Sequence, residues 1–277
     1  MDGQRAAVLA RAEATYNVEL REKNEPMKRA EMRASLALYD GVLMTLGDRY
    51  DAGVFEAAGT PRAKILANFG VGFNHIDVAA AEAAGLVVTN TPGAVTDATA
   101  DVAMTLLLMT CRRAGEGERL VRSGAWEGWH PVQMLGLHVT GKRVGILGMG
   151  RIGKLAAINL QSLGFDVAGL SRSGGDGAVP MFSGDEMDRF LARTDLLICL
   201  LPLTPDTRGI LNAETFAKLP RGAALVHAGR GAHVSRDRYF AAAAGRERGR
   251  AAADARGAHR GSAAGGAASR AAGARQT

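Results

Sequence analysis

The chain has 277 residues, 47% of them hydrophobic, and its mean hydropathy is close to zero. These values are typical of a globular protein with one or two buried cores. No apolar run is long enough to span a bilayer, because the run 196–203 is interrupted by Pro202, and the N-terminus leads into no signal-peptide core. We therefore expect a cytoplasmic protein without a membrane partner.

The positive charge of the chain is concentrated at one end. The formal net charge is +6, and residues 241–277 contribute +5 of it, with seven arginines against one glutamate and one aspartate. The rest of the chain offers no basic face for a polyanion, and we predict no nucleic-acid partner. Beyond Phe240 the sequence has no Leu, Ile, Val, Phe or Met, so residues 235–277 are predicted to form a disordered tail.

The first 92 residues alternate between helix and strand patterns. Helices are predicted over residues 6–14, 28–38, 51–58 and 78–84, and strands over residues 16–20, 41–46, 64–68 and 86–89. This alternation predicts an α/β domain over residues 1–92, with a parallel sheet that helices cover on both faces.

A turn at residues 91–93 begins a second domain, which we place at 93–234. A long helix over 98–113, capped by Thr96 or Asp97, is apolar on nearly every side. We expect such a helix to be buried in a core or against a second subunit. Beyond a looser segment, strands are predicted over residues 143–147, 166–170, 196–201 and 223–227, and helices over residues 154–160, 185–192 and 214–219. The looser segment carries Trp126 and Trp129, for which interface or core packing is the expected role.

Cys111 and Cys199 each lie inside an apolar segment, and neither has metal-ligand spacing around it. We expect buried, reduced thiols and no metal site.

The most informative motif is the glycine-rich turn after the strand 143–147. Gly148, Gly150 and Gly153 have the GxGxxG spacing between a strand and a helix, which is the context that dinucleotide binding requires. The first glycine permits the tight turn, the second leaves room for a pyrophosphate, and the third lets helix and strand pack closely. The helix start adds unpaired N–H groups and a positive dipole end. The motif predicts a Rossmann domain that binds a nicotinamide dinucleotide.

The end of the next strand bears on which nucleotide binds. NAD sites usually carry an acid about 20 residues past the glycines, whereas this chain has Ser171, Arg172 and Ser173 there. A hydroxyl and a guanidinium can hold a 2′-phosphate, which an acid would repel. We expect NADP in preference to NAD. The alternative is that Arg172 is a solvated loop residue and that selectivity is loose.

In this order, the motifs resemble those of the D-isomer-specific 2-hydroxyacid dehydrogenases, in particular the glyoxylate/hydroxypyruvate reductase branch. The resemblance covers about residues 8–234 and is carried by the segments 68–77, 88–92, 96–101, 148–153, 201–207 and 228–231. It implies an α/β fold in which a Rossmann domain is joined to a smaller, flavodoxin-like substrate domain. The implied reaction is hydride transfer between a nicotinamide and a short 2-oxoacid such as glyoxylate or hydroxypyruvate. A homodimer is implied as well, with the helix from Ala98 at its core and residues 126–131 crossing to the second subunit.

The resemblance also assigns roles to individual residues. It implies that backbone N–H groups at Val71 and Gly72 bind the substrate carboxylate, a task that suits glycine-loop amides. Arg230 is implied as the catalytic and substrate-binding arginine, and a structural salt bridge is its alternative role. The implied cofactor-binding residues are Thr99, Gly148, Met149, Gly150, Arg151, Ile152, Gly153, Ser171, Arg172, Ser173, Pro202, Thr207, Ala228, Gly229 and Arg230.

The acid–base pair of the family is not found where the resemblance places it. In the family a histidine that protonates the alkoxide and a glutamate that raises its pKa follow the arginine, but after Val234 the expected strand, that glutamate and the Pro-His motif do not appear. His75 is expected to be a packed loop residue, His227 has no carboxylate nearby in sequence, and His233 and His259 are weaker candidates still for the missing histidine. The strand that precedes the family's first helix is not found either. We therefore expect a chain that is truncated at both ends and marginally stable.

These features leave three hypotheses. The first is a reductase of a small 2-oxoacid that prefers NADP. The second is an NAD(P)-binding protein without turnover, and the third is a non-functional fragment of an enzyme.

Overall fold

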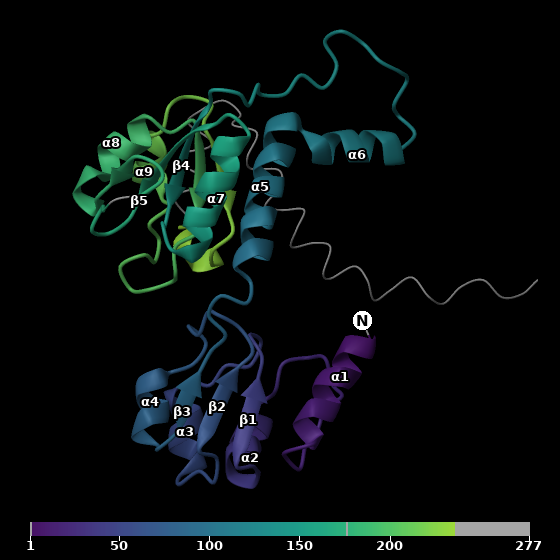
Figure 1. Ribbon diagram of the computed structural model, residues 1–277, viewed down its shortest axis with the longest axis vertical. Helices are drawn as coiled ribbons and strands as arrows, with labels where there is room; N and C mark the ends of the chain where they lie inside the picture. Colours follow the sequence, from purple (N-terminus) through teal and green to yellow (C-terminus); the bar gives the residue numbers. More distant parts are fainter. Residues whose placement is uncertain (1, 176, 236–277) are drawn as a thin grey trace, which may run out of the picture. The chain divides into compact units, whose positions relative to one another are not determined.

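The computed structural model describes residues 2–175 and 177–235, so the predicted tail from residue 236 on lies outside the described residues. The chain divides into two compact units, one ending at Pro92 and the other beginning at Gly93. Each unit is built on one parallel sheet with helices (Figure 1), which confirms the α/β class. No helix among the described residues has the length and apolarity needed to cross a membrane.

The sheet of unit 1 has three parallel strands in the order β1-β2-β3. Val42, Leu66 and Val88 are aligned across it in register. The strands are β1 (Gly41–Met44), β2 (Ile65–Asn68) and β3 (Val87–Thr89), and the helices are α1 (Asp2–Glu13), α2 (Arg29–Leu38), α3 (Ala52–Ala58) and α4 (Val78–Ala83).

In the described structure only one face of this sheet is covered, although the alternation of helices and strands by itself predicts helices on both faces. Alternate residues such as Met44 and Leu66 are buried against α2, α3 and α4. Their neighbours on the other face are exposed, Leu43 by 72% and Val87 by 61%. The strands therefore alternate in burial, although the residues on both faces are apolar.

The strand predicted over residues 16–20 does not form. Tyr16 and Leu20 are exposed, and the segment pairs with no strand in the described structure. The alternating pattern of Tyr16, Val18 and Leu20 was misleading, because a strand needs a neighbour to satisfy its backbone groups. The other predicted elements of this unit form within two residues of their expected ends, apart from the longer first helix.

Unit 2 contains a five-stranded parallel sheet with the order β6-β5-β4-β7-β8. This is the Rossmann strand order 3-2-1-4-5, with the topological switch between β4 and β7. The strands are β4 (Arg143–Leu147), β5 (Asp166–Leu170), β6 (Met181–Phe182), β7 (Leu196–Cys199) and β8 (Ala224–His227). The helices are α5 (Thr96–Arg112), α6 (Ala114–Arg122), α7 (Arg151–Ser162), α8 (Met187–Ala192) and α9 (Ala213–Ala217), with 3₁₀ turns η1 (Gly184–Glu186) and η2 (Gly231–His233).

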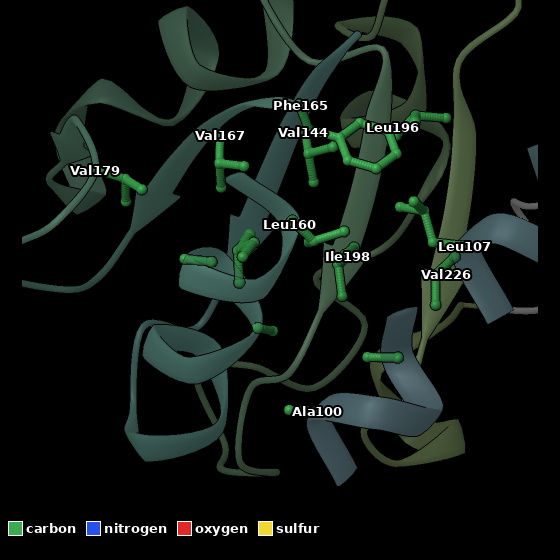
Figure 2. Close-up of a cluster of buried hydrophobic side chains, with 14 of the residues drawn as sticks. Ala100, Leu107, Val144, Leu160, Phe165, Val167, Val179, Leu196, Ile198 and Val226 are labelled. Carbon is green, nitrogen blue, oxygen red and sulfur yellow. The ribbon is translucent and has the colours of Figure 1, made fainter. Parts of the chain in front are cut away.

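Both faces of this second sheet are buried. Figure 2 shows one core, in which Val144, Ile198 and Val226 of the strands face Leu107 of α5 and Leu160 of α7. The opposite face packs against α8 and α9 through residues that include Leu197, Cys199, Phe190 and Leu191. Neighbouring residues of one strand thus point into different cores, which explains why these strands are continuous apolar runs.

Within this chain, the long helix α5 is buried along one side only, so the prediction of a helix buried in the core holds for that side. Ala103 and Leu107 lie in the core, whereas Val102, Leu106 and Met109 are exposed. The helix begins at Thr96, so its N-cap residue is Val95, whose side chain makes no capping hydrogen bond. Thr96 and Asp97 lie inside the helix and therefore do not cap it.

The segment after α5 is also exposed. Trp126 is 54% exposed and Trp129 is 80% exposed, so neither tryptophan packs into the described core. The helix α6, which was not predicted, buries no residue.

Candidate functional site

Four of the predicted cofactor segments lie at the same edge of the unit 2 sheet. Residues 148–153 follow β4, residues 171–173 follow β5, residues 202–207 follow β7, and residues 228–230 follow β8. All these strands are parallel neighbours, so their carboxyl ends meet at one edge. Ligands of open α/β sheets bind outside this edge at the topological switch point. The fold thus brings together residues that are more than 80 positions apart.

The three glycines of the turn have different surroundings. Gly148 has φ +109°, and a Cβ there would lie 2.9 Å from the backbone of Leu200. A Cβ at Gly153 would lie 2.2 Å from the carbonyl oxygen of Gly148. At Gly150, by contrast, a Cβ would meet nothing within 4 Å. The turn is therefore tight on the protein side and open at the start of α7, so these residues fit a nucleotide pyrophosphate.

Met149 can contribute only its backbone to this opening. Its side chain is buried and lies against Gly169 of β5, where a Cβ would come within 2.3 Å of it. Arg151 is exposed and Ile152 is half-buried at the start of α7.

The turn after β5 presents one guanidinium to solvent. Ser171 donates its hydroxyl to the carbonyl of Gly174 at 2.6 Å, which closes the turn. Arg172 and Ser173 are exposed, and Arg172 has no ion pair among the described residues. The guanidinium is thus available for an anionic group.

The loop after β7 is held together by Thr207. Its hydroxyl donates to the carbonyl of Pro202 at 2.7 Å and accepts from the N–H of Thr204 at 2.8 Å. Thr207 therefore shapes the loop from within. Thr99, on the first turns of α5, likewise donates its hydroxyl to the carbonyl of Val95 at 2.7 Å.

The segment after β8 carries Arg230 and the buried His233, to which the sequence assigns no role. His233 is fully buried, and its Nδ1 accepts the N–H of Arg230 at 3.1 Å. Its Nε2 lies 3.2 Å from the carbonyl oxygen of Pro202, to which it can only donate. The ring of His233 thereby links the Arg230 backbone to the Pro202 loop. A Cβ at Gly229 would come within 2.9 Å of this ring, so only glycine leaves room for it.

His227 and Cys199 lie beside His233. Nε2 of His227 is 3.2 Å from Nδ1 of His233. Burial lowers the pKa of His227, and the neighbouring His233 lowers it further. Burial also raises the pKa of the Cys199 thiol to about 11, so the thiol is protonated at neutral pH. Both cysteines of the sequence are free and buried, as expected.

In unit 1, the loop at Val71 and Gly72 is held from behind by two asparagines. Asn68, which is buried, donates to the carbonyls of Gly70 at 2.9 Å and Gly72 at 3.0 Å. Asn90 donates to the carbonyl of Val71 at 2.9 Å. The N–H groups of Val71 and Gly72 have no acceptor among the described residues. Fixed carbonyls and free amides are the arrangement that suits an anion.

His75 belongs to the same network. Its Nε2 lies 3.1 Å from Oδ1 of Asn68, and its side chain is half-buried. Sequence reasoning missed Asn68 and Asn90, although both stand at the carboxyl ends of predicted strands, where polar side chains often serve a site.

Comparisons with known proteins agree with this geometry. Residues 104–258 match the family model described as D-isomer specific 2-hydroxyacid dehydrogenase, NAD binding domain. A glyoxylate reductase of Thermococcus onnurineus (strain NA1) is 36% identical over 222 residues, which are 78% of this chain and 66% of that protein. A glycerate dehydrogenase of Hyphomicrobium methylovorum is 33% identical over 85% of this chain and 74% of that protein.

A solved structure is similar to this chain in both sequence and fold. The crystal structure of the TT0316 protein from Thermus thermophilus is 35% identical and superposes with a TM-score of 0.78, over 85% of this chain and 74% of that one. The chain thus spans about two thirds to three quarters of the length of these relatives. On this evidence, the chain belongs to the D-isomer specific 2-hydroxyacid dehydrogenase family.

Proposed function

We propose that this protein is an oxidoreductase that reduces a small 2-oxoacid, such as glyoxylate or hydroxypyruvate, with a nicotinamide dinucleotide. The observation that carries the proposal is the open space at Gly150, at the start of α7 and at the switch point of a Rossmann sheet. The names of the relatives, glyoxylate reductase and glycerate dehydrogenase, support this substrate class. Residues 1–92 would then be the substrate domain and residues 93–234 the cofactor domain.

Residues of the chain hold the reactants in this proposal. The free N–H groups of Val71 and Gly72 bind the carboxylate of the 2-oxoacid. Arg230 binds the carboxylate and the carbonyl oxygen, and its guanidinium stabilises the negative charge that forms on that oxygen. The N–H groups at the start of α7 bind the pyrophosphate. The nicotinamide, when bound, supplies the hydride.

We also propose a preference for NADP over NAD. The exposed guanidinium of Arg172 has no ion pair among the described residues and stands where an acid would bind the ribose hydroxyls of NAD. Ser171 and Ser173 flank it and can accept or donate further hydrogen bonds to a 2′-phosphate.

The exposed apolar surface of unit 2 supports a homodimer. Val102, Leu106 and Met109 form an uncovered side of α5, and Trp126 and Trp129 follow in the exposed segment. Val102, Leu106 and Met109 follow helical spacing and so share one side of α5, and exposed apolar residues grouped in this way often mark an interaction site. We propose that a second copy of the chain covers it.

One observation favours a second candidate, a protein that binds the nucleotide without turnover. His227 and His233 contact each other and a backbone carbonyl, and neither is bonded to a carboxylate in the described part of the chain. Among residues 2–175 and 177–235, neither histidine therefore has the carboxylate partner that a general acid of this family uses.

Both candidate functions require nucleotide binding, and calorimetric titration with NADPH and NADH tests this step. Gly150→Ala adds a methyl group that meets no protein atom within 4 Å, so the variant should melt like the wild type. The same methyl group occupies the space next to the pyrophosphate, and nucleotide affinity should fall at least tenfold. Gly117→Ala on α6 is the matched control, because its Cβ would make only an ordinary contact of 3.6 Å with Met134.

The two candidates then differ in turnover. Oxidation of NADPH in the presence of glyoxylate supports the reductase, whereas binding without oxidation selects the second candidate. Equal affinities in the wild type and Gly150→Ala would overturn the nucleotide site itself.

A further inference from the structure

Three metal-ligating side chains meet near Arg230, and the proposed reaction uses none of them. Cys199 ends β7 and His227 ends β8, and the two residues are direct partners in the register of these parallel strands. Register partners project from the same face of a sheet, here the face that packs against α8 and α9. His233 reaches the pair from η2. One donor atom from each of the three residues lies within 4.8 Å of the others.

The set of donors is suited to zinc and similar ions. A thiolate and two imidazoles are ligands that Zn²⁺ prefers, and three protein ligands leave a fourth position for water. Two nitrogens bound to one tetrahedral zinc at about 2.0–2.1 Å stand about 3.3 Å apart. Nε2 of His227 and Nδ1 of His233 are 3.2 Å apart, which already matches that spacing.

The hydrogen bonds of His233 leave its Nδ1 without a proton. Nε2 of His233 donates to the carbonyl of Pro202, and its Nδ1 accepts the N–H of Arg230, so Nδ1 carries no proton. Ligating histidines typically fix their outer nitrogen on a carbonyl in this way. The lone pair of His233 Nδ1 faces Nε2 of His227 at 3.2 Å, and a cation bound between the two nitrogens would take the place of the proton in that contact.

Burial completes the arrangement. Cys199 and His233 are both 0% exposed, and His227 is partly exposed, so it is the open side of the cluster. A metal ion would replace the thiol proton of Cys199, which leaves to the buffer, and bond to the thiolate sulfur. It would also take the Nδ1 lone pair that now accepts the N–H of Arg230.

We propose that Cys199, His227 and His233 form a binding site for Zn²⁺ or a similar divalent transition-metal ion, with water as the fourth ligand. The site goes beyond the proposed oxidoreductase function and does not depend on it. The competing explanation is that the two rings share a proton and bind no metal.

Titration of the purified, reduced protein with Co²⁺ tests the proposal without any activity measurement. Cobalt bound to a thiolate gives a sulfur-to-metal charge-transfer band in the near ultraviolet, and four-coordination gives intense visible bands. We expect both to saturate at one equivalent and to be abolished by one equivalent of Zn²⁺. Cys199→Ser should remove the charge-transfer band. Cys111→Ser, which changes the only other cysteine of the sequence, should retain it.

The histidines are tested in the same assay. His227→Asn and His233→Asn should each weaken Co²⁺ binding more than the roughly 10–100-fold that loss of an outer hydrogen-bond partner costs. His138→Asn, on an exposed segment, should leave the affinity unchanged. The titration of the wild type tests the proposal even if a variant fails to fold. A wild-type cobalt spectrum without a thiolate band, or no cobalt binding at all, would overturn the site.

Discussion

At the residue scale, Gly148, Gly150 and Gly153 serve different physical needs although the motif treats them alike. Gly148 adopts a φ that side chains disfavour, and Gly153 lies against the carbonyl of Gly148. Both are therefore required by the protein itself. Of the three, only Gly150 borders open space, which fits its proposed role beside the pyrophosphate. This difference separates the glycines that the fold requires from the one that we propose for nucleotide binding.

Replacement of one arginine should change the choice of nucleotide. Arg172→Ala removes the guanidinium that we place against the 2′-phosphate, and charge-assisted hydrogen bonds are worth about 1.5–3 kcal/mol. We expect the Kd for NADPH to rise about 10–100-fold while the Kd for NADH stays nearly constant, as measured by calorimetry. Arg119→Ala on α6, another exposed arginine, is the control. A variant that still prefers NADPH would disprove the role of Arg172.

At the scale of elements, the sequence predicted the buried strands best. The strands at 143–147, 166–170 and 196–199 are continuous apolar runs because each is buried on both faces. The helix α6 was missed because Gly115 and Gly117 lower helix propensity and because it buries no apolar side. The two-residue strand β6 is too short to produce a pattern.

The site was predictable only where it is local in sequence. The glycine turn is contained in six residues, so its spacing indicated its role. The Cys199, His227 and His233 cluster depends on the register between β7 and β8, which no spacing reveals. The support of the Val71 loop by Asn68 and Asn90 likewise depends on the parallel alignment of strands.

The loop after β2 should lose its substrate affinity when its support is removed. Asn68→Ala deletes two hydrogen bonds to loop carbonyls and one contact with His75. At about 1 kcal/mol for each bond, the KM for glyoxylate should rise roughly 10–100-fold. Nucleotide affinity should not change, because the residues that we propose for nucleotide binding belong to unit 2. Asn212→Ala, which removes the cap of α9, is the control and should lower stability alone.

The ion pair at the start of β4 and β7 should make stability depend on pH. Arg143 donates to Asp195 at 3.0 and 2.8 Å, and this bond holds the pKa of the Asp195 carboxyl below its usual value. A lowered pKa stabilises the fold above the unfolded-state pKa of about 4, and this contribution disappears as the pH falls through the folded-state pKa.

Urea unfolding of Asp195→Asn at several pH values checks the direction of this pH dependence. The variant should be about 1 kcal/mol less stable than the wild type near neutral pH, and the difference should shrink below about pH 4. Asp206→Asn changes an exposed aspartate outside the ion pairs of the described residues, so it should show no such trend. A constant difference for Asp195→Asn at all pH values would contradict the assignment.

At the scale of the whole molecule, the exposed tryptophans predict association of two chains. Trp129 is 80% exposed and therefore contributes little to the fold of its own chain. Tryptophans buried in an interface often contribute about 2 kcal/mol or more to binding. Trp129→Ala should therefore raise the dimer dissociation constant roughly 30-fold, as measured by sedimentation velocity across a concentration series, without changing the circular dichroism spectrum.

The control is Val8→Ala, which changes an exposed apolar residue of α1 and should sediment like the wild type. A wild type that stays monomeric at high concentration would exclude the dimer, and a Trp129→Ala dimer of unchanged affinity would locate the interface elsewhere.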